Sequence, residues 1–286
     1  MWQNLIKLFK ISRPISWVNT AYPFAAAYLV TGGENWTLLL VGTLFFLIPY
    51  NLLMYGVNDV FDYESDIKNP RKGGIEGAME QKAFHPTILV ASFSLVLPFI
   101  IWLLLAGNLI ANAVLLMSVF FVIAYSIKYL RFKEIPILDS VTSSIHFVSP
   151  LVYGLVLTAS LNDHWMIIIA FFLWGMASHA LGAIQDIIPD REGGLSSIAT
   201  VLGAKNTIWL VFSFYLASSL LIMATGTYGL VVGLAGLIYA ANCLPYLNVS
   251  DATSAQVNKA WRRFIWLNLF VGFVITICLI LILQSI

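Results

Sequence analysis

Residues 37–66 read TLLLVGTLFFLIPYNLLMYGVNDVFDYESD, and this stretch decides the kind of fold. Residues 37–57 contain no charged side chain, whereas four carboxylates follow within residues 59–66. A helix of about 20 apolar residues spans the roughly 30 Å hydrocarbon core of a bilayer. The stretch therefore predicts a membrane-spanning helix over 37–57 that ends in an acidic segment at the membrane surface.

The composition of the whole chain indicates the same class of protein. Apolar residues make up 60% of the 286 residues and charged residues 10%, whereas soluble domains have about 45–50% and 25%. So few charges cannot cover a soluble surface, and a net charge of +1 offers no basic face to a nucleic acid. Both cysteines, Cys243 and Cys278, lie in apolar stretches, which excludes a disulfide scaffold. We expect an all-α integral membrane protein with a single domain over residues 1–286.

Hydropathy predicts nine membrane-spanning helices, at 14–31, 37–57, 87–106, 109–127, 136–158, 165–186, 207–224, 228–247 and 264–284. With this assignment all 15 Lys and Arg residues lie on one side of the membrane. The positive-inside rule makes that side cytoplasmic. We therefore expect a cytoplasmic N-terminus, an external C-terminus, and chemistry in the long cytoplasmic loops 58–86 and 187–206.

Two acidic motifs follow even-numbered spans and so reach the same membrane face. Asn58, Asp62 and Asp66 recur every fourth residue, and Asp186 and Asp190 repeat this spacing. On a helix, side chains four residues apart lie on one face, where like charges repel. A divalent cation between them makes the arrangement favourable. Asp186 follows Asp62 by 124 residues, as Asp190 follows Asp66, which suggests two four-helix repeats that each carry one motif.

Basic residues accompany both motifs. Oxygen ligands beside cations suit Mg²⁺, which is usually shared between a few carboxylates and a substrate phosphate. Arg grips phosphate oxygens bidentately, and Lys acts as a point charge. One such acidic motif is more often a solvated face, but two motifs flanked by cations favour a diphosphate site. The basic residues are Arg71, Lys72, Lys128, Arg131, Lys133 and Arg191.

On these motifs the chain resembles the UbiA superfamily of intramembrane prenyltransferases, whose hallmarks are NxxxDxxxD after helix two and DxxxD after helix six. The resemblance implies nine transmembrane helices around a central cavity and two Mg²⁺ ions that bind a prenyl diphosphate. It implies metal ligation by Asn58, Asp62, Asp66, Asp186 and Asp190, of which the aspartates are catalytic. It also implies diphosphate binding by Asn58, Arg71, Lys72, Lys128, Arg131 and Arg191.

A narrower resemblance is to the lycopene elongases that make C50 carotenoids in actinobacteria. It rests on residues 12–24, 46–51, 58–74, 124–126 and 195–201. It implies transfer of C5 units from dimethylallyl diphosphate to both ends of lycopene, with a hydroxyl on each new unit. Ile127-Lys128-Tyr129 departs from the Pro-containing turn expected there, which puts the role of Lys128 in doubt.

The residues themselves favour an apolar acceptor weakly, because the spans hold no Lys or Arg that could bind a polar head. Aromatic faces stabilise an allylic cation, and Tyr55 and Phe61, which flank the first motif, are the best candidates for that catalytic role. His146 and His179 lie within spans, where an ionisable group is a candidate base or water-orienting group. A histidine at such a position is more often neutral and hydrogen-bonded to a neighbouring carbonyl.

Two other functions remain open at this point. One is a UbiA-type prenyltransferase with an aromatic, quinone-precursor or polar-lipid acceptor, for which the diphosphate site is unchanged. The other is a secondary transporter, whose repeats give similar hydropathy. The acids lie at the membrane surface with cations beside them, and this arrangement favours an enzyme over a transporter.

Overall fold

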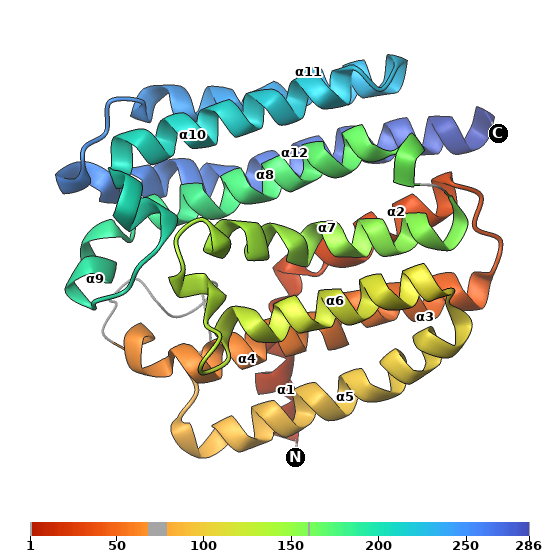
Figure 1. The fold of residues 1–286 in the computed structure, drawn as a ribbon, viewed down its shortest axis with the longest axis horizontal. Helices are drawn as coiled ribbons and strands as arrows, with labels where there is room; N and C mark the ends of the chain where they lie inside the picture. The colour runs from red at the N-terminus through yellow and green to blue at the C-terminus, as the bar shows by residue number, and fades with distance from the viewer. Residues whose placement is uncertain (1, 68–78, 160, 286) are drawn as a thin grey trace. The chain divides into compact units, whose positions relative to one another are not determined.

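The structure, a computed structural model, describes residues 2–67, 79–159 and 161–285. Its regular elements in these ranges are all helical (Figure 1). The α-helices are α1 (Trp2–Ile11), α2 (Val18–Val30), α3 (Trp36–Leu47), α4 (Pro49–Asp66), α5 (His85–Ala106), α6 (Leu109–Ser126), α7 (Leu138–Thr158), α8 (Trp165–Ile184), α9 (Ile187–Glu192), α10 (Ile198–Met223), α11 (Thr227–Cys243) and α12 (Asn258–Ser285). Short 3-10 helices lie at Pro14–Ser16, Lys82–Phe84, Phe132–Glu134, Leu161–Asp163, Leu244–Tyr246 and Asp251–Val257.

Eight segments of the described ranges are long and apolar enough to cross a membrane. The predicted all-α membrane class is confirmed, but the predicted count of nine spans is not. The difference is the first span, predicted over 14–31, where α2 has only 13 residues. Arg13 adopts a left-handed conformation and a 3-10 turn begins at Pro14. Because proline has no N–H to donate to the preceding turn, α1 does not continue through Pro14, and α2 begins only at Val18.

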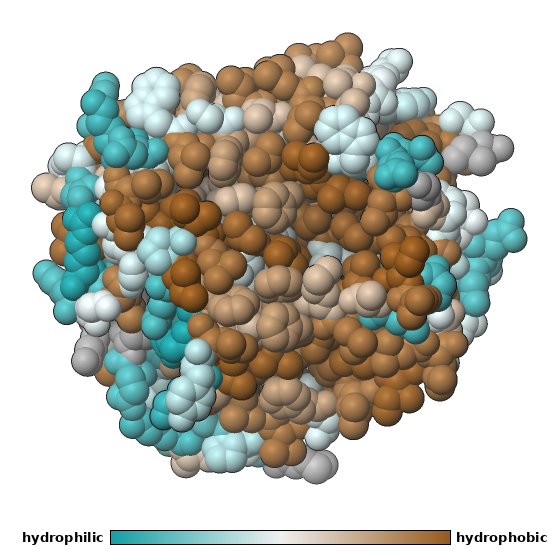
Figure 2. Space-filling model, in the orientation of Figure 1, coloured by the Kyte–Doolittle hydropathy of each residue, from teal (hydrophilic) through white to brown (hydrophobic). Residues whose placement is uncertain are grey.

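Large apolar side chains cover the outside of the helices, as the brown areas in Figure 2 show. Leu105 and Leu109 are 83% and 86% exposed, and Trp266 is 72% exposed. A soluble domain rarely leaves contiguous apolar patches of this kind in water. Exposing apolar side chains to hydrocarbon does not carry the unfavourable free energy of exposing them to water, so this surface suits the interior of a bilayer.

The chain forms two compact units, and the boundary between them falls within α7. Unit 1 comprises residues 1–132 and 146–161, and unit 2 comprises residues 133–145 and 162–286. The core of unit 1 is aromatic: the rings of Phe24 and Tyr153 are stacked with centroids 5.7 Å apart, and Phe46 contacts both. This aromatic core holds the helices that carry the first acidic motif.

The junction between α3 and α4 positions that motif. α3 ends at Leu47 and α4 begins at Pro49, and the last carbonyls of a helix lack intrahelical donors. The buried side chain of Asn51 satisfies two of these carbonyls, since its Nδ2 donates to those of Phe46 (2.8 Å) and Leu47 (3.1 Å). Thr20 of α2 also donates to the Phe46 carbonyl, at 2.7 Å. The start of α4 is therefore fixed against α2.

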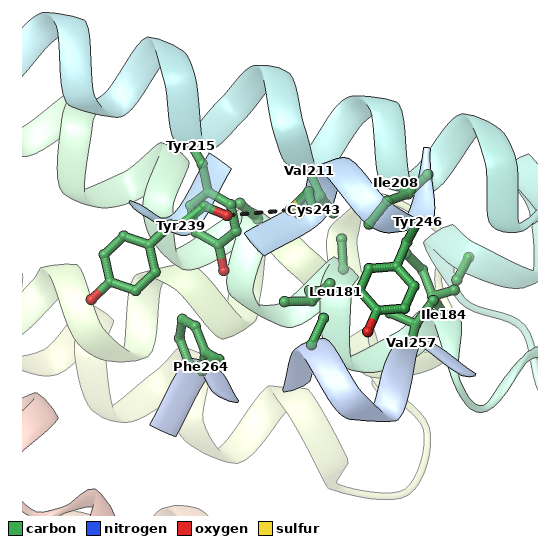
Figure 3. Close-up of a cluster of buried hydrophobic side chains, with 14 of the residues drawn as sticks. Leu181, Ile184, Ile208, Val211, Tyr215, Tyr239, Cys243, Tyr246, Val257 and Phe264 are labelled. Atoms are coloured by element: carbon green, nitrogen blue, oxygen red, sulfur yellow. Dashed lines mark hydrogen bonds between the residues drawn. The ribbon is translucent and has the colours of Figure 1, made fainter. Parts of the chain in front are cut away.

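Unit 2 has its own core, in which α8, α10, α11 and α12 pack around buried side chains (Figure 3). Leu181 and Ile184 of α8 have no exposed surface. The Tyr215 and Tyr239 rings are stacked, with centroids 5.3 Å apart. One side of α8 is thus held within an apolar core, which leaves its other side for the polar residues described below.

A close approach of α7 to α2 in unit 1 requires glycine. A Cβ at Gly154 lies only 2.6 Å from the Phe24 carbonyl oxygen, which belongs to the backbone and cannot move aside. We expect Gly154→Ala to lower the free energy of unfolding by about 1–3 kcal/mol, as overpacking does, in denaturant titrations in detergent. The control is Gly272→Ala on α12, where nothing lies within 4 Å. Equal stability of the two variants contradicts the prediction.

Candidate active site

The first acidic motif lies on the last two turns of α4, which runs without interruption to Asp66. The predicted helix through Asn58, Asp62 and Asp66 is therefore confirmed. Asn58 Nδ2 donates to Asp62 Oδ2 at 2.8 Å and to Ser126 Oγ of α6 at 2.9 Å. Both bonds use the amide nitrogen, so the amide oxygen of Asn58 remains the atom that can ligate a cation.

Arg131 joins this motif from the segment after α6. Its Nη2 lies 3.7 Å from Asp62 Oδ1, and its Nη1 donates to the Phe61 carbonyl at 3.2 Å. The Asp62 side chain is 6% exposed, so the pair is largely shielded from solvent. Arg131 and the nearby Tyr129 have φ values of 40° and 80°, an uncommon conformation for residues other than glycine. The structure thus brings together a carboxylate and a cation that the sequence placed 69 residues apart.

A buried ion pair beside the motif was not predicted. Arg13 Nη2 contacts Asp59 Oδ1 at 2.6 Å, and their side chains are 18% and 2% exposed. The Arg13 guanidinium also lies 4.2 Å from the centre of the Tyr55 ring. A cation therefore already occupies a face of the ring that we expected to stabilise a carbocation. The only signal in the sequence was a single Arg before Pro14 and an acid next to Asn58.

The remaining predicted site residues have different positions. Lys128, a predicted diphosphate ligand after α6, is exposed, and its Nζ lies 5.3 Å from the Tyr129 ring centre. Phe61, which we expected to stabilise the allylic cation, is half-buried at the edge of the unit 1 core. Arg71 and Lys72 lie outside the described residues.

The second motif lies in unit 2, at the short helix α9. Asp186 precedes α9, and the backbone N–H of Asp190 donates to the Asp186 carbonyl at 2.8 Å. One helical turn therefore separates the two acids, as their spacing predicted. Both side chains are partly exposed.

Arg191 ties this motif to the rest of unit 2. Its Nη1 donates to Asp251 Oδ2 at 2.7 Å, and its Nη2 donates to the Thr200 carbonyl at 2.6 Å. Asp251 also accepts the backbone N–H of Ala204 at 2.7 Å. The guanidinium predicted to bind diphosphate thus also holds α9 beside the start of α10.

The two histidines have different surroundings. His146 is 3% exposed, and its Nε2 lies 3.2 Å from the Phe121 carbonyl. This contact is typical of a neutral structural histidine. His179 of α8 belongs to unit 2, where its Nδ1 lies 3.0 Å from Ser140 Oγ.

The donor atoms suit Mg²⁺. Each motif offers carboxylate oxygens, and the first adds the Asn58 amide oxygen. Within the residues that the structure describes, no three Asp, Glu, His or Cys side chains form a metal-binding group. Mg²⁺ often binds through one or two carboxylates, with waters and substrate phosphates as its other ligands. The residues of each motif fit that mode of binding.

The profile of the UbiA prenyltransferase family matches residues 20–280. The chain belongs to this family. Its sequence is 49% identical to a lycopene elongase/hydratase of Corynebacterium glutamicum, over 99% of this chain and 100% of that protein. It is 48% identical to the C(50) beta-cyclic carotenoids biosynthesis protein LbtBC of Dietzia sp., over 95% of this chain and 64% of that protein. The predicted resemblance is confirmed, and the protein is a multi-pass membrane prenyltransferase.

Solved structures show the same fold. A UbiA homologue from Archaeoglobus fulgidus bound to DMAPP and Mg²⁺ has a TM-score of 0.67 at 17% identity and covers 93% of this chain and 98% of its own. An apo UbiA homologue from Aeropyrum pernix has a TM-score of 0.70 at 18% identity and covers 92% and 98%. The UbiA fold predicted for this chain is therefore confirmed.

Proposed function

We propose that this protein transfers C5 units from dimethylallyl diphosphate to the ends of lycopene, with hydroxylation of each added unit, and so makes acyclic C45 and C50 carotenoids. The observation that carries the proposal is the 49% identity with the lycopene elongase/hydratase of C. glutamicum over essentially both chains. The A. fulgidus homologue bound to DMAPP and Mg²⁺ supports the donor and the ion.

In this proposal Asn58, Asp62 and Asp66 hold one Mg²⁺ ion, and Asp186 and Asp190 hold a second. When bound, the ions neutralise charge on the departing diphosphate. The hydrogen bond from Asn58 orients the Asp62 carboxylate toward the ion that it binds.

Positive charge for the phosphate oxygens comes from the chain itself. Arg131 is already at the first motif, and its planar guanidinium can turn from Asp62 to grip two phosphate oxygens. Beside the second motif, the guanidinium of Arg191 can turn from Asp251 and bind phosphate oxygens in the same way. Arg71, Lys72 and Lys128 are further candidates, and Lys128 is the weakest because it lies against Tyr129.

Ionisation of the donor leaves an allylic cation that an aromatic face can stabilise. Phe61 is the better candidate for this role. Tyr55 faces the Arg13 guanidinium at 4.2 Å, and a second positive charge at the same face is repelled. Tyr55 would stabilise the allylic cation only from its other face.

An aromatic acceptor is the alternative. The chain is 24% identical to glycinol 4-dimethylallyltransferase of Glycine max, over 82% of this chain and 62% of that protein. The proposed donor is the same, so only the acceptor separates the two functions. The much higher identity to lycopene elongase/hydratase favours the carotenoid.

The decisive experiment supplies membranes that contain the protein with Mg²⁺, lycopene and dimethylallyl diphosphate, and analyses the products by mass spectrometry. We expect C45 and C50 carotenoids whose formation stops when EDTA removes the metal. The oxygen content of the products reports on hydroxylation. If diphosphate is released with an aromatic acceptor but not with lycopene, lycopene is not the acceptor. If diphosphate is released with neither acceptor, dimethylallyl diphosphate is not the donor.

We also propose that the N-terminus and both acidic motifs face the cytoplasm and that the C-terminus is external, because all Lys and Arg residues fall on one side in the predicted topology. Both native cysteines are buried, so single cysteines introduced at exposed positions report on sidedness. We expect Thr225→Cys to react with an impermeant maleimide in intact cells, and Glu192→Cys to react only after permeabilisation. The reverse pattern contradicts the orientation.

A further inference from the structure

Unit 2 contains a polar cluster that belongs to neither acidic motif. It joins Asp139 and Ser140 of α7 to His179 of α8 and Ile198 of α10. Asp139 and Ser140 have no exposed surface. Ser140 Oγ lies 3.0 Å from His179 Nδ1, and Asp139 Oδ2 accepts the backbone N–H of Ile198 at 2.7 Å. Ionisable groups within membrane-spanning helices are costly, and where they occur they are usually functional.

Close packing of α7 against α8 fixes the position of the His179 ring. A Cβ at Gly175 comes within 2.4 Å of Ser144 Oγ, so the two helices are as near as glycine allows. Ser144 Oγ also donates to the Phe172 carbonyl of α8, at 2.7 Å. The opposite side of α8 is held by Leu181 and Ile184 in the unit 2 core (Figure 3). The imidazole therefore has little freedom to move.

Asp139 adds a buried carboxyl group to this cluster. Its Oδ1 accepts the backbone N–H of Ser140 at 2.6 Å, so both carboxylate oxygens are held by backbone donors. Desolvation of the buried His179 ring disfavours the imidazolium, and the Coulombic interaction with Asp139 offsets part of this effect when the ring accepts a proton.

His179 lies near the end of α8 that leads to the second motif. It precedes the last residue of α8, Ile184, by five residues, which is about 7.5 Å along the helix axis at 1.5 Å per residue. Asp186 follows in the turn between α8 and α9. The proposed diphosphate site at Asp186 therefore adjoins the end of α8 that carries His179.

The proposed reaction releases one proton there. A terminal double bond of the acceptor forms a C–C bond to C1 of the dimethylallyl group, while the C–O bond breaks and its electron pair leaves with diphosphate. The acceptor becomes a tertiary carbocation. It then loses a proton from a neighbouring carbon to form a new double bond. This deprotonation needs a base.

We propose that His179 is the base that accepts this proton, and that Ser140 and Asp139 position its imidazole. The tautomer in which Nδ1–H donates to Ser140 Oγ is the one in which Nε2 receives the proton. The assignment rests on the proposed function, because it needs a carbocation on an alkene acceptor. It makes His179 a catalytic residue and gives the two α7 residues a role separate from metal binding.

The test compares His179→Gln with His146→Gln, which alters the other mid-span histidine, in unit 1. We expect His179→Gln to lower kcat for C45 formation about 100-fold, as loss of a general base does, with KM for dimethylallyl diphosphate unchanged. Diphosphate release should exceed C45 formation, because cations that are not deprotonated revert to the dimethylallyl cation and are captured by water as dimethylallyl alcohol. His146→Gln should match the wild type in rate and in this ratio.

Ser140 variants test the positioning role. We expect Ser140→Ala to uncouple diphosphate release from C45 formation, and Ser140→Thr, which keeps the hydroxyl, to restore the coupling. Thermal unfolding in detergent shows which variants are folded, and only folded variants are compared. A folded His179→Gln with wild-type kcat and coupling overturns the inference while the proposed function stands. Absence of C45 product from the wild type itself means that the proposed function has failed.

Discussion

Asp62→Asn should lower prenyl transfer by about 100- to 1,000-fold, the usual cost of removing one charge-stabilising group at a reacting centre. The substitution keeps an oxygen that accepts the hydrogen bond from Asn58, so α4 and its contact with Ser126 should survive. What it removes is the negative charge that binds Mg²⁺. The loss should appear in kcat and as a shift of the Mg²⁺ dependence to higher concentrations. Asp186→Asn in unit 2 should behave in the same way.

The matched control is Glu64→Gln on the same helix. Glu64 is 75% exposed and pairs with Lys82 at the surface, so its charge should not matter for turnover. The yield and thermal unfolding of all three variants in detergent should equal those of the wild type. If the Asp62→Asn enzyme retains more than about a tenth of wild-type activity, the metal assignment for this residue is contradicted. Removal of a charge-stabilising group at a reacting centre usually lowers the rate by more than about tenfold.

Asp59→Asn should reduce the free energy of unfolding by about 3 kcal/mol, since breaking a buried ion pair leaves one charge uncompensated. The charge left behind is the Arg13 guanidinium, which is 18% exposed and packed on Tyr55. Loss of this pair frees the turn at Pro14 that separates α1 from α2. The measurement is a denaturant titration in detergent.

A double-mutant cycle separates the ion pair from other effects of the substitution. Asp59→Asn combined with Arg13→Met should recover most of the lost stability, because the remaining buried charge is then gone as well. Breaking the exposed Lys82–Glu64 pair by Glu64→Gln provides the comparison and should produce no measurable change. If the losses from Arg13→Met and Asp59→Asn simply add, the two residues are not coupled and the pair does not stabilise the fold.

The membrane class, the all-helical fold, the family and the two acidic motifs could all be predicted from the sequence. Each of these is a local property: hydropathy over about 20 residues reports on a span, and carboxylates four residues apart share a helix face wherever that helix lies. The run from residue 49 to Asp66 formed a single helix for the same reason. The metal and diphosphate roles of these residues stay predictions until the variants are measured.

The tertiary structure decided which groups meet. Arg13 and Asp59 are 46 residues apart and Arg191 and Asp251 are 60 apart, and charge patterning along a chain does not reveal such partners, because they depend on how helices pack. The same packing placed Arg13 on Tyr55 and Ser140 beside His179. Hydropathy also overestimated the first span, since it measures apolarity and does not register that α2 begins only at Val18, after the turn at Pro14, and has 13 residues. The sequence therefore determined the membrane environment, the family and the two acidic motifs of this protein, and long-range packing determined which side chains meet Arg13, Arg191 and His179.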